Sequence, residues 1–444
     1  MQLGHSKDHR PDLAQIKVMA AVAQPSGLWI ASSIESGESA DDPLYVPIAA
    51  RAREILSQRG LLYIGDSKMA ALRTRADFVA HQDYYLCPLP RTGETAQQIE
   101  GWIDEIVEGS RSAELIKVSS PTGDPTQSRL VGAGYEFERR LTAVVDPSRP
   151  DSKMEWTERV QVVRSTSHAR RQSQSLDERL AKATEALKRL TPPVGRGHRQ
   201  IRDEVTLDTE IQKVLDLYRV RGLMEVRTQR EEEATVSYVG PGRGGSNRPT
   251  RTQTKIRYQI TEIVLLPVAL ERQRRHLGWQ AFATNFPAER MSLSEAQGAY
   301  RQSNPIEGGF HLLKDRPLGI RPLYVREDAQ ILGLGRLLTI ALRVLTLIQI
   351  QVRAELGKRH EALSGLYVEA PNKTTDRPTS RRLLSAFVRA EITLTRIEAG
   401  GQTLWYLTPL PSSLQGILDL LHLPDDLYLR LLQNPPVPSP PLRE

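Results

Sequence analysis

The stretch LLYIGDSKMAALRTRADFVAHQDYYLCPL, residues 61–89, decides the fold class. Its first four residues, 61–64, form a short apolar run that is typical of a buried strand, and Asp66 follows one glycine later. The spacing then predicts a helix over 68–80 and a second strand over 84–89. A strand, a helix and another strand in this order indicate an α/β protein with an acid at the end of the first strand.

The residues before this stretch extend the same pattern. Two apolar segments, 16–22 and 27–33, are predicted strands, and the Pro-Ser-Gly sequence at 25–27 is a turn between them. A helix is expected over 47–59. We therefore assign residues 1–108 to the first part of an α/β core.

The character of the chain changes between residues 109 and 284. Segments of alternating polar and apolar residues at 135–145, 158–164 and 254–264 are separated by Gly- and Pro-rich sequence. This pattern predicts a β-rich insertion domain over 109–284. The basic, glycine-rich sequence GPGRGGSNRPTRT, residues 240–252, is expected at the flexible tip of a hairpin.

A helical segment is expected inside the insertion. Ser175 and Glu178 are spaced as a capping box, so that the helix is predicted to begin there. The apolar residues that follow have helical spacing and define one buried face: Leu176, Leu180, Ala183 and Leu187.

Residues 285–360 are expected to complete the core. They include an apolar segment, 331–352, that is long enough to cross a bilayer. Arg336 and Arg343 interrupt it, and two cations in a lone membrane span would each cost about 2.5–3.5 kcal/mol. We therefore predict a buried core helix and no membrane partner.

The last part of the chain has the pattern of a small α+β module, residues 361–430. A helix over 381–390 is followed by an expected hairpin with strands 392–396 and 403–407, and a helix begins at Ser412. The proline-rich residues that remain, 431–444, are expected to be a disordered tail.

Composition places the chain among ordinary soluble proteins. It has 444 residues, of which 39% are hydrophobic and 25% charged, which excludes wholesale disorder and a polytopic membrane protein. A net charge of +7 suits a polyanionic partner. Cys87 is the single cysteine, so an internal disulfide is excluded, and no apolar leader opens the sequence, so we expect a cytoplasmic protein.

The residues that carry chemistry lie in AYRQSNPIEGGFHLLKDRPLGIRPLYV, residues 299–325. Glu307, Phe310, His311 and Lys314 stand at offsets of zero, three, four and seven, so they share one face of a helix. By itself this spacing is also that of an ordinary amphipathic helix with surface charges.

Together with other phrases, this stretch resembles the DDE transposases of bacterial insertion sequences, in the insertion-sequence-four superfamily. The family signature is Tyr, two residues, Arg, three residues, Glu, six residues, Lys. Tyr300, Glu307 and Lys314 match it, whereas Ser303 occupies the arginine position and Arg301 lies two residues earlier. The other matching phrases are LGHSKDHRPDL (3–13), GLLYIGDSKMAALRTRADF (60–78), YYLCPL (84–89) and RPTSRRLLSAF (377–387).

The resemblance implies an RNase-H-like core interrupted by a β-rich insertion between its second and third acids. Asp66 then corresponds to the second aspartate and Glu307 to the glutamate, and both are expected to bind Mg²⁺ or Mn²⁺. Tyr300, Arg301 and Lys314 are expected to contact DNA phosphates. Arg301 and Lys314, together with Arg316 and Arg321, should form a basic track on the face that carries the acids.

The implied function is transposition, in which metal-dependent cleavage at the element ends is followed by strand transfer to target DNA. Double-stranded DNA is the expected partner, in a homo-oligomer associated with the bacterial nucleoid. The family's first aspartate precedes the phrase matched at 3–13, so we expect this chain to lack it and to be catalytically incomplete; Asp8 and Asp12 are the nearest acids. The alternative is a non-catalytic DNA-binding or dimerising remnant that modulates a complete transposase.

Overall fold

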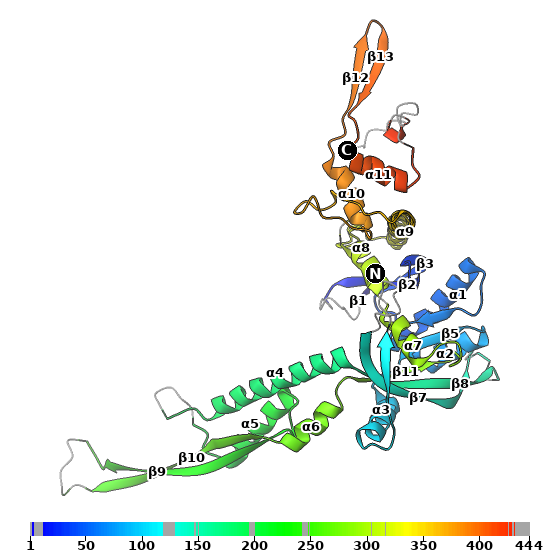
Figure 1. The fold of residues 1–444 in the computed structure, drawn as a ribbon. Helices are drawn as coiled ribbons and strands as arrows, with labels where there is room; N and C mark the ends of the chain where they lie inside the picture. The colour runs from blue at the N-terminus through cyan, green and yellow to red at the C-terminus, as the bar shows by residue number, and fades with distance from the viewer. Residues whose placement is uncertain are drawn as a thin grey trace. The chain divides into compact units, whose positions relative to one another are not determined.

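The computed structural model divides the chain into two compact units, residues 1–61 with 299–444 and residues 62–298 (Figure 1). Both contain helices and strands, so the protein is α/β as expected. The domain boundaries expected at 108 and 284 both fall inside the second unit. The structure describes residues 2–3, 12–118, 129–145, 148–149, 151–194, 200–241, 247, 249–302, 304–315, 317–424, 426–428 and 430.

A six-stranded mixed sheet organises the second unit, in the order β4-β5-β11-β8-β7-β6. β4 and β5 are parallel, whereas every other neighbouring pair is antiparallel. The strands are β4 (Leu62–Ile64), β5 (Tyr84–Pro88), β6 (Glu114–Val118), β7 (Arg129–Val144), β8 (Lys153–Ser165) and β11 (Trp279–Thr284). Strands of the expected insertion therefore extend the same sheet as β4 and β5.

The connection from β4 to β5 is a broken helix, so the continuous helix predicted over 68–80 is wrong. A short 3-10 helix, η2 (Ser67–Ala70), ends at Ala71, whose ψ of 133° is extended, and α2 (Leu72–Ala80) begins after it. On one sheet face, Arg75 of α2 reaches Glu158 of β8, and α3 (Gly93–Val107) packs Trp102 edge-on against Phe137 of β7. Successive strand residues alternate between faces, so Gln161 of β8 points to the other face, where it accepts a hydrogen bond from Gln297 of α7 (Leu293–Arg301).

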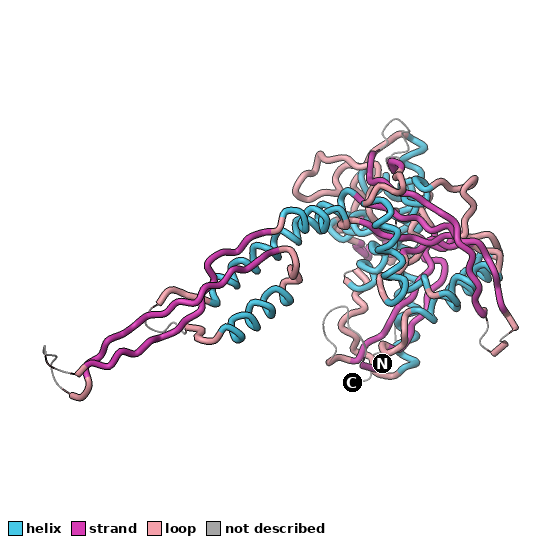
Figure 2. The backbone as a smooth tube through the Cα atoms, turned by 90° about the horizontal axis from the view of Figure 1, so that it is seen from below, coloured by secondary structure: helices cyan, strands magenta, loops and turns pink. Residues whose placement is uncertain are grey.

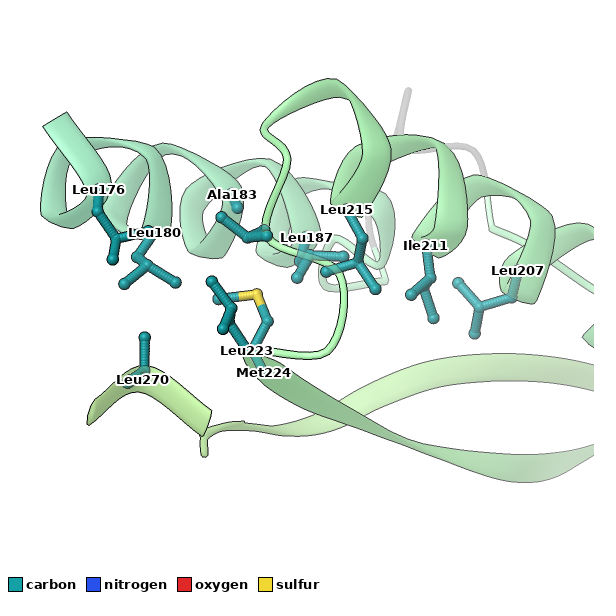
Figure 3. Packing of buried hydrophobic residues seen from close by; sticks show 11 residues of the cluster. Leu176, Leu180, Ala183, Leu187, Leu207, Ile211, Leu215, Leu223, Met224 and Leu270 are labelled. Atoms are coloured by element: carbon teal, nitrogen blue, oxygen red, sulfur yellow. The ribbon is translucent and has the colours of Figure 1, made fainter. Parts of the chain in front are cut away.

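A second apolar core lies between β8 and β11 in the chain (Figure 3). Figure 2 shows its long two-stranded ribbon with helices alongside. The elements are α4 (Thr166–Leu190), α5 (Glu204–Leu217), β9 (Met224–Tyr238), β10 (Thr250–Leu265) and α6 (Pro267–Arg275). The core residues are Leu176, Leu180, Ala183, Leu187, Leu207, Ile211, Leu215, Val220, Leu223, Met224 and Leu270. The predicted apolar face of α4 is thus confirmed.

The predicted start of that helix is wrong. α4 begins at Thr166, where the Ser165 hydroxyl accepts a hydrogen bond from the His168 backbone N–H at 3.4 Å. Ser175 lies inside the helix. The glycine-rich residues 240–252 join β9 to β10, and 242–246 and 248 lie outside the described residues.

The first unit is built on a hairpin from the start of the chain and helices from its later part. β2 (Ala14–Ala23) pairs with β3 (Leu28–Ser36), as predicted, and α1 (Tyr45–Leu56) follows. β1 (Gln2–Leu3) adds a short antiparallel strand to β2. Trp29 of β3 is buried against α8 (Asn304–Lys314) and α9 (Asp328–Arg359), in a cluster that includes Leu313, Ile320 and Leu342.

α9 buries one face and exposes another, whereas its sequence predicted a buried core helix. Nine of its residues are buried, but Leu337, Ile340, Val344 and Leu347 remain 63%, 54%, 50% and 50% exposed. Arg343 donates to the Ile30 carbonyl at 3.0 Å. Among the described residues, α9 is the one helix that is long and apolar enough to cross a membrane, and 33% of its apolar window is buried.

The C-terminal module follows the predicted element order. α10 (Ser380–Arg389), the hairpin β12 (Leu394–Ala399) with β13 (Gln402–Leu407), and α11 (Ser412–Leu420) all lie close to their predicted positions. Gly400 and Gly401 form the two-residue turn with φ of 58° and 76°, a conformation that favours glycine. α10 and α11 pack against the end of α9, and residues 431–444 lie outside the described residues.

Candidate functional site

Asp66 lies immediately after β4, at its carboxyl end. The Gly65 backbone N–H donates to the Leu86 carbonyl at 3.2 Å, which prolongs the pairing with β5. A Cβ atom at Gly65 would lie 2.6 Å from the Met69 Sδ atom, so glycine permits this tight turn. Asp66 then caps η2, because its Oδ1 atom accepts a hydrogen bond from the Lys68 backbone N–H at 2.9 Å. Its side chain is exposed.

A buried charge network holds the helix that follows Asp66. Glu158 of β8 is 0% exposed and accepts hydrogen bonds from Arg75, from Arg139 at 2.9 Å and from the Tyr85 hydroxyl at 2.6 Å. Arg75 also donates to the Ala70 carbonyl at 2.9 Å, which ties the end of η2 to the sheet. Burial opposes the Arg75 charge, but the Glu158 carboxylate raises the pKa of Arg75 above its usual value. Fixed charges therefore anchor the turn that carries Asp66.

Cys87 lies in the sheet interior beside this network. Burial raises the pKa of its thiol to about 12, and the carboxylates of Glu158 and Asp66 add to the effect, whereas Arg75 opposes it. The cysteine is fully buried, so it has no access to a substrate.

Glu307 lies in the first turn of α8, the helix predicted around it. The helix approaches β3 closely at Gly309, where the lack of a side chain leaves room for Trp29. A Cβ atom at this position would lie 2.5 Å from the Trp29 Nε1 atom. Phe310 packs edge-on against Trp29, with ring centroids 5.1 Å apart, and so fixes the rotation of α8. The Glu307 side chain is exposed and has no hydrogen bond or ion pair with any described residue. Its carboxylate is therefore available to a ligand.

Lys314 ends α8 and lines a groove of about 620 Å³. The groove walls combine charged side chains with apolar ones from the loop after α8 and from α9: Lys314, Asp315, Leu318, Ile320, Arg321, Pro322, Tyr324, Val325, Leu334 and Leu338. Lys314 has no ion pair with a carboxylate in the described chain, whereas Arg321 donates to Asp315 at 3.0 Å. Arg321 and His311 hold the pKa of Asp315 below its usual value. The groove thus offers a cation beside an apolar surface.

Tyr300 and Arg301 end α7, and both side chains are half-buried. They precede α8 by only a few residues, so the signature positions lie at the junction of two helices. Ser303 and Arg316 lie outside the described residues. Of the expected basic track, Lys314 and Arg321 line the same groove.

The two candidate metal ligands belong to different compact units. Asp66 lies in the unit of residues 62–298, and Glu307 lies in the other, so their expected convergence remains a prediction. Both are exposed carboxylates, which suit a hard ion such as Mg²⁺. Within the described ranges, no three His, Cys, Asp or Glu side chains gather as a ligand set. Asp12 is exposed ahead of β2, and Asp8 lies outside those ranges.

Two features of the structure were not predicted from the sequence. The buried Glu158 network was missed because an acid in an alternating strand is usually placed on the solvent face. The arginines of α10 were assigned to a linker and helix without a role, although their density in TTDRPTSRR was visible.

Comparison with family models gave no match to this chain, and comparison with curated proteins likewise gave none. The function must therefore be inferred from the residues and their placement. The features that bear on it most are an acid at a strand end, an acid in the first turn of a helix, and a cationic groove at the end of that helix.

Proposed function

We propose that the protein is a DNA transposase of the DDE type, with an RNase-H-like core that brings Asp66 and Glu307 to one metal site. The proposal is supported by the position of each acid. Asp66 follows a parallel strand, where the carboxyl end of the strand exposes it, and Glu307 is exposed on α8. These are the placements that the family resemblance requires.

Hard divalent cations explain why two acids serve this reaction. Mg²⁺ or Mn²⁺ takes oxygen ligands, and such ions, when bound here, would supply the Lewis acidity that phosphoryl transfer needs. Asp66 and Glu307 would supply carboxylate oxygens to such ions. Gly65 and the Asp66 cap on η2 hold one ligand, and the Phe310 contact with Trp29 holds the other.

The groove at Lys314 is the proposed contact for the DNA backbone near the cleaved bond. Lys314 acts as a point charge for a phosphate, and Arg321 lies in the same groove. Tyr300 and Arg301 are proposed to contact phosphates from the end of α7. Together these residues would orient the duplex relative to Glu307.

The proposed partners are duplex DNA and a second copy of the chain, in the bacterial cytoplasm and at the nucleoid. α9 does not need a membrane in this proposal. Its buried face packs on β3 and the C-terminal helices, and Arg343 is held by a carbonyl of β3. The exposed apolar face of α9 is the part of the helix that a protein partner would cover.

One observation carries the proposal. The Glu307 carboxylate is exposed and has no ion pair among the described residues, and it lies on the helix that ends at Lys314. The test of the proposal begins with metal binding, measured as Mn²⁺ affinity of the intact chain. Asp66→Asn and Glu307→Gln should each weaken Mn²⁺ binding, because each removes a charged oxygen ligand. Glu271→Gln is the control, since Glu271 is an exposed carboxylate paired with Arg275 on α6. Equal Mn²⁺ affinity in all four proteins would refute the metal site.

The second part of the test uses a duplex that carries the ends of the DNA segment encoding the chain. Mg²⁺-dependent cleavage that both substitutions abolish supports the enzyme. Duplex binding and Mn²⁺ binding without cleavage support the alternative, a non-catalytic form that binds DNA and modulates a complete transposase.

A further inference from the structure

A cluster of basic residues covers one face of the C-terminal module. Between residues 370 and 390 five side chains are basic, and Asp376 alone is acidic. All five are exposed: Lys373, Arg377, Arg381, Arg382 and Arg389, which we name the C-terminal basic patch. None of the five forms an ion pair with a carboxylate among the residues that the structure describes.

The fold of α10 gathers three of these cations. Leu383 and Ala386 turn one face of the helix into the core of the module. At 100° per residue, Arg381, Arg382 and Arg389 then fall within one exposed arc of about 100° that flanks the buried face. The hairpin β12–β13 follows directly after this helix (Figure 1).

Tyr367 brings the loop before α10 into the same patch. The Arg382 guanidinium lies 4.0 Å from the centroid of the Tyr367 ring, and the Lys373 Nζ atom lies 4.6 Å from it. One aromatic ring thus holds two cations from different segments. The two cations repel each other, so an anion that binds near both would stabilise the arrangement.

A half-buried arginine lies beneath the patch. Arg353 of α9 donates to the Pro378 carbonyl at 2.9 Å and to the Arg377 carbonyl at 3.4 Å, so it supports the loop that carries Arg377. Burial lowers the pKa of Arg353, repulsion from Arg377 lowers it further, and Asp376 opposes the effect. The positive potential of the patch therefore extends below its surface.

We propose that the C-terminal basic patch is a second contact surface for duplex DNA, which binds the phosphate backbone without reading its sequence. The inference rests on the proposed function, because that function supplies the duplex. Arg381 and Arg389 are eight residues apart, or about 12 Å along the helix, so one small anion does not reach both. An extended polyanion such as duplex DNA, with one charge per about 1.7 Å of axis, does. Leu383 and Ala386 of α10 are buried in the module's own core, whereas Leu384 and Val388 are exposed beside the arginines, so binding to lipid vesicles is measured alongside binding to the duplex.

The test compares two triple variants of the full chain. The patch variant carries Arg377→Gln, Arg381→Gln and Arg382→Gln. The control variant carries Lys182→Gln, Arg189→Gln and Arg272→Gln, three exposed cations that also lack a carboxylate partner among the described residues. Both variants lose the same net charge, and circular dichroism checks that both fold. Affinity for a duplex of random sequence is then measured over a range of salt concentrations.

The patch variant should bind the duplex roughly tenfold or more weakly at about 0.1 M salt, with a log–log salt slope shallower by about 0.9 for each phosphate that the variant no longer neutralises. The control variant should keep the wild-type slope. Replacing the same three arginines by lysine should largely restore the slope, because a phosphate accepts either cation. Equal slopes for the patch and control variants would overturn the proposal.

Two further outcomes separate this inference from the proposed function. If Lys314→Gln weakens duplex binding while the patch variant does not, the patch inference fails and the proposed function stands. If the patch variant instead loses binding to vesicles of phosphatidylcholine and phosphatidylglycerol with no change on the duplex, the surface belongs to a membrane and the DNA assignment is overturned.

Discussion

The guanidinium of Arg75 on α2 is hydrogen-bonded to the carboxylate of Glu158 on β8, and the two residues are only 5% and 0% exposed. The pair lies under the turn that carries Asp66, because Arg75 also holds the Ala70 carbonyl. A buried ion pair in this position links the stability of the sheet to the geometry of the candidate site.

Breaking this pair should destabilise the protein strongly. Arg75→Met leaves the Glu158 charge buried without its closest cation, and we expect a loss of about 3–5 kcal/mol in the free energy of unfolding. Urea denaturation monitored by circular dichroism measures the change. The exposed pair Glu271–Arg275 is the control, and Glu271→Gln should cost less than about 1 kcal/mol. Similar losses in the two variants would contradict a structural role for the buried pair.

Two glycines of α9 should respond oppositely to alanine. A Cβ atom at Gly333 has no neighbour within 4 Å, so Gly333→Ala should stabilise the helix by about 0.5–1 kcal/mol. A Cβ atom at Gly335 would lie 1.8 Å from the Ile34 Cδ1 atom, so Gly335→Ala should cost about 1–3 kcal/mol. Thermal unfolding of both variants compares them, and a stabilised Gly335→Ala protein would contradict the packing of α9 on β3.

Cys87 should be inert in the folded protein. Burial raises the pKa of its thiol to about 12, so at pH 8 the native thiol is protonated and inaccessible. An aromatic disulfide reagent should react with it only after unfolding. Because its pKa is higher when folded than the usual value of about 8.5, Cys87 favours the folded state below that pH and loses this contribution as the pH rises toward 12. Rapid reaction at pH 8 without denaturant would refute its burial.

Asp66 and Glu307, 241 positions apart, should converge when Mn²⁺ and duplex DNA bind. In a protein with Lys68→Cys and Gly308→Cys, which keeps both candidate metal ligands, a short bismaleimide should join the two segments, which proteolysis between them would reveal as linked fragments. Cys87 does not compete, because it is buried. Each single variant is the control. Absence of the link with metal and DNA present would argue against a shared site.

Local pattern was enough to predict much of the fold. The apolar runs around β4 and β5, the Gly400–Gly401 turn and the apolar face of α4 each depend on neighbours in the sequence. Their signals are periodicity and turn chemistry, which the chain carries locally.

The remainder of the fold depends on contacts that are distant in sequence. The break at Ala71 accompanies the Asp66 cap and the Arg75 hydrogen bond to Ala70, whereas alanine by itself favours a helix. The polar start of α4 is supported by Gln172, which accepts a hydrogen bond from the Gly278 backbone N–H at 2.7 Å. Nothing in residues 166–174 alone predicts that partner. Likewise, the position of β11 between β5 and β8 depends on pairing across long stretches of chain.

Of the candidate site, the helix around Glu307 and the strand end at Asp66 were predictable, because both have local patterns. The groove beside Lys314 was not, since its walls come from α8, the loop after it and α9. The exposed face of α9 could not be predicted either, because the sequence of an apolar helix does not indicate which side its neighbours cover.

The burial of Trp29 against Leu313 and Leu342 has a consequence for synthesis on the ribosome. Trp29 and Leu313 are separated by 284 positions, and at about 5–20 residues per second the ribosome takes roughly 15–60 s to cover that distance. Residues 62–298 form a compact unit from one continuous segment and are complete before α9 is made. The nascent β2–β3 hairpin therefore waits with its apolar face uncovered, and chaperones that bind such surfaces should associate with the chain during this interval.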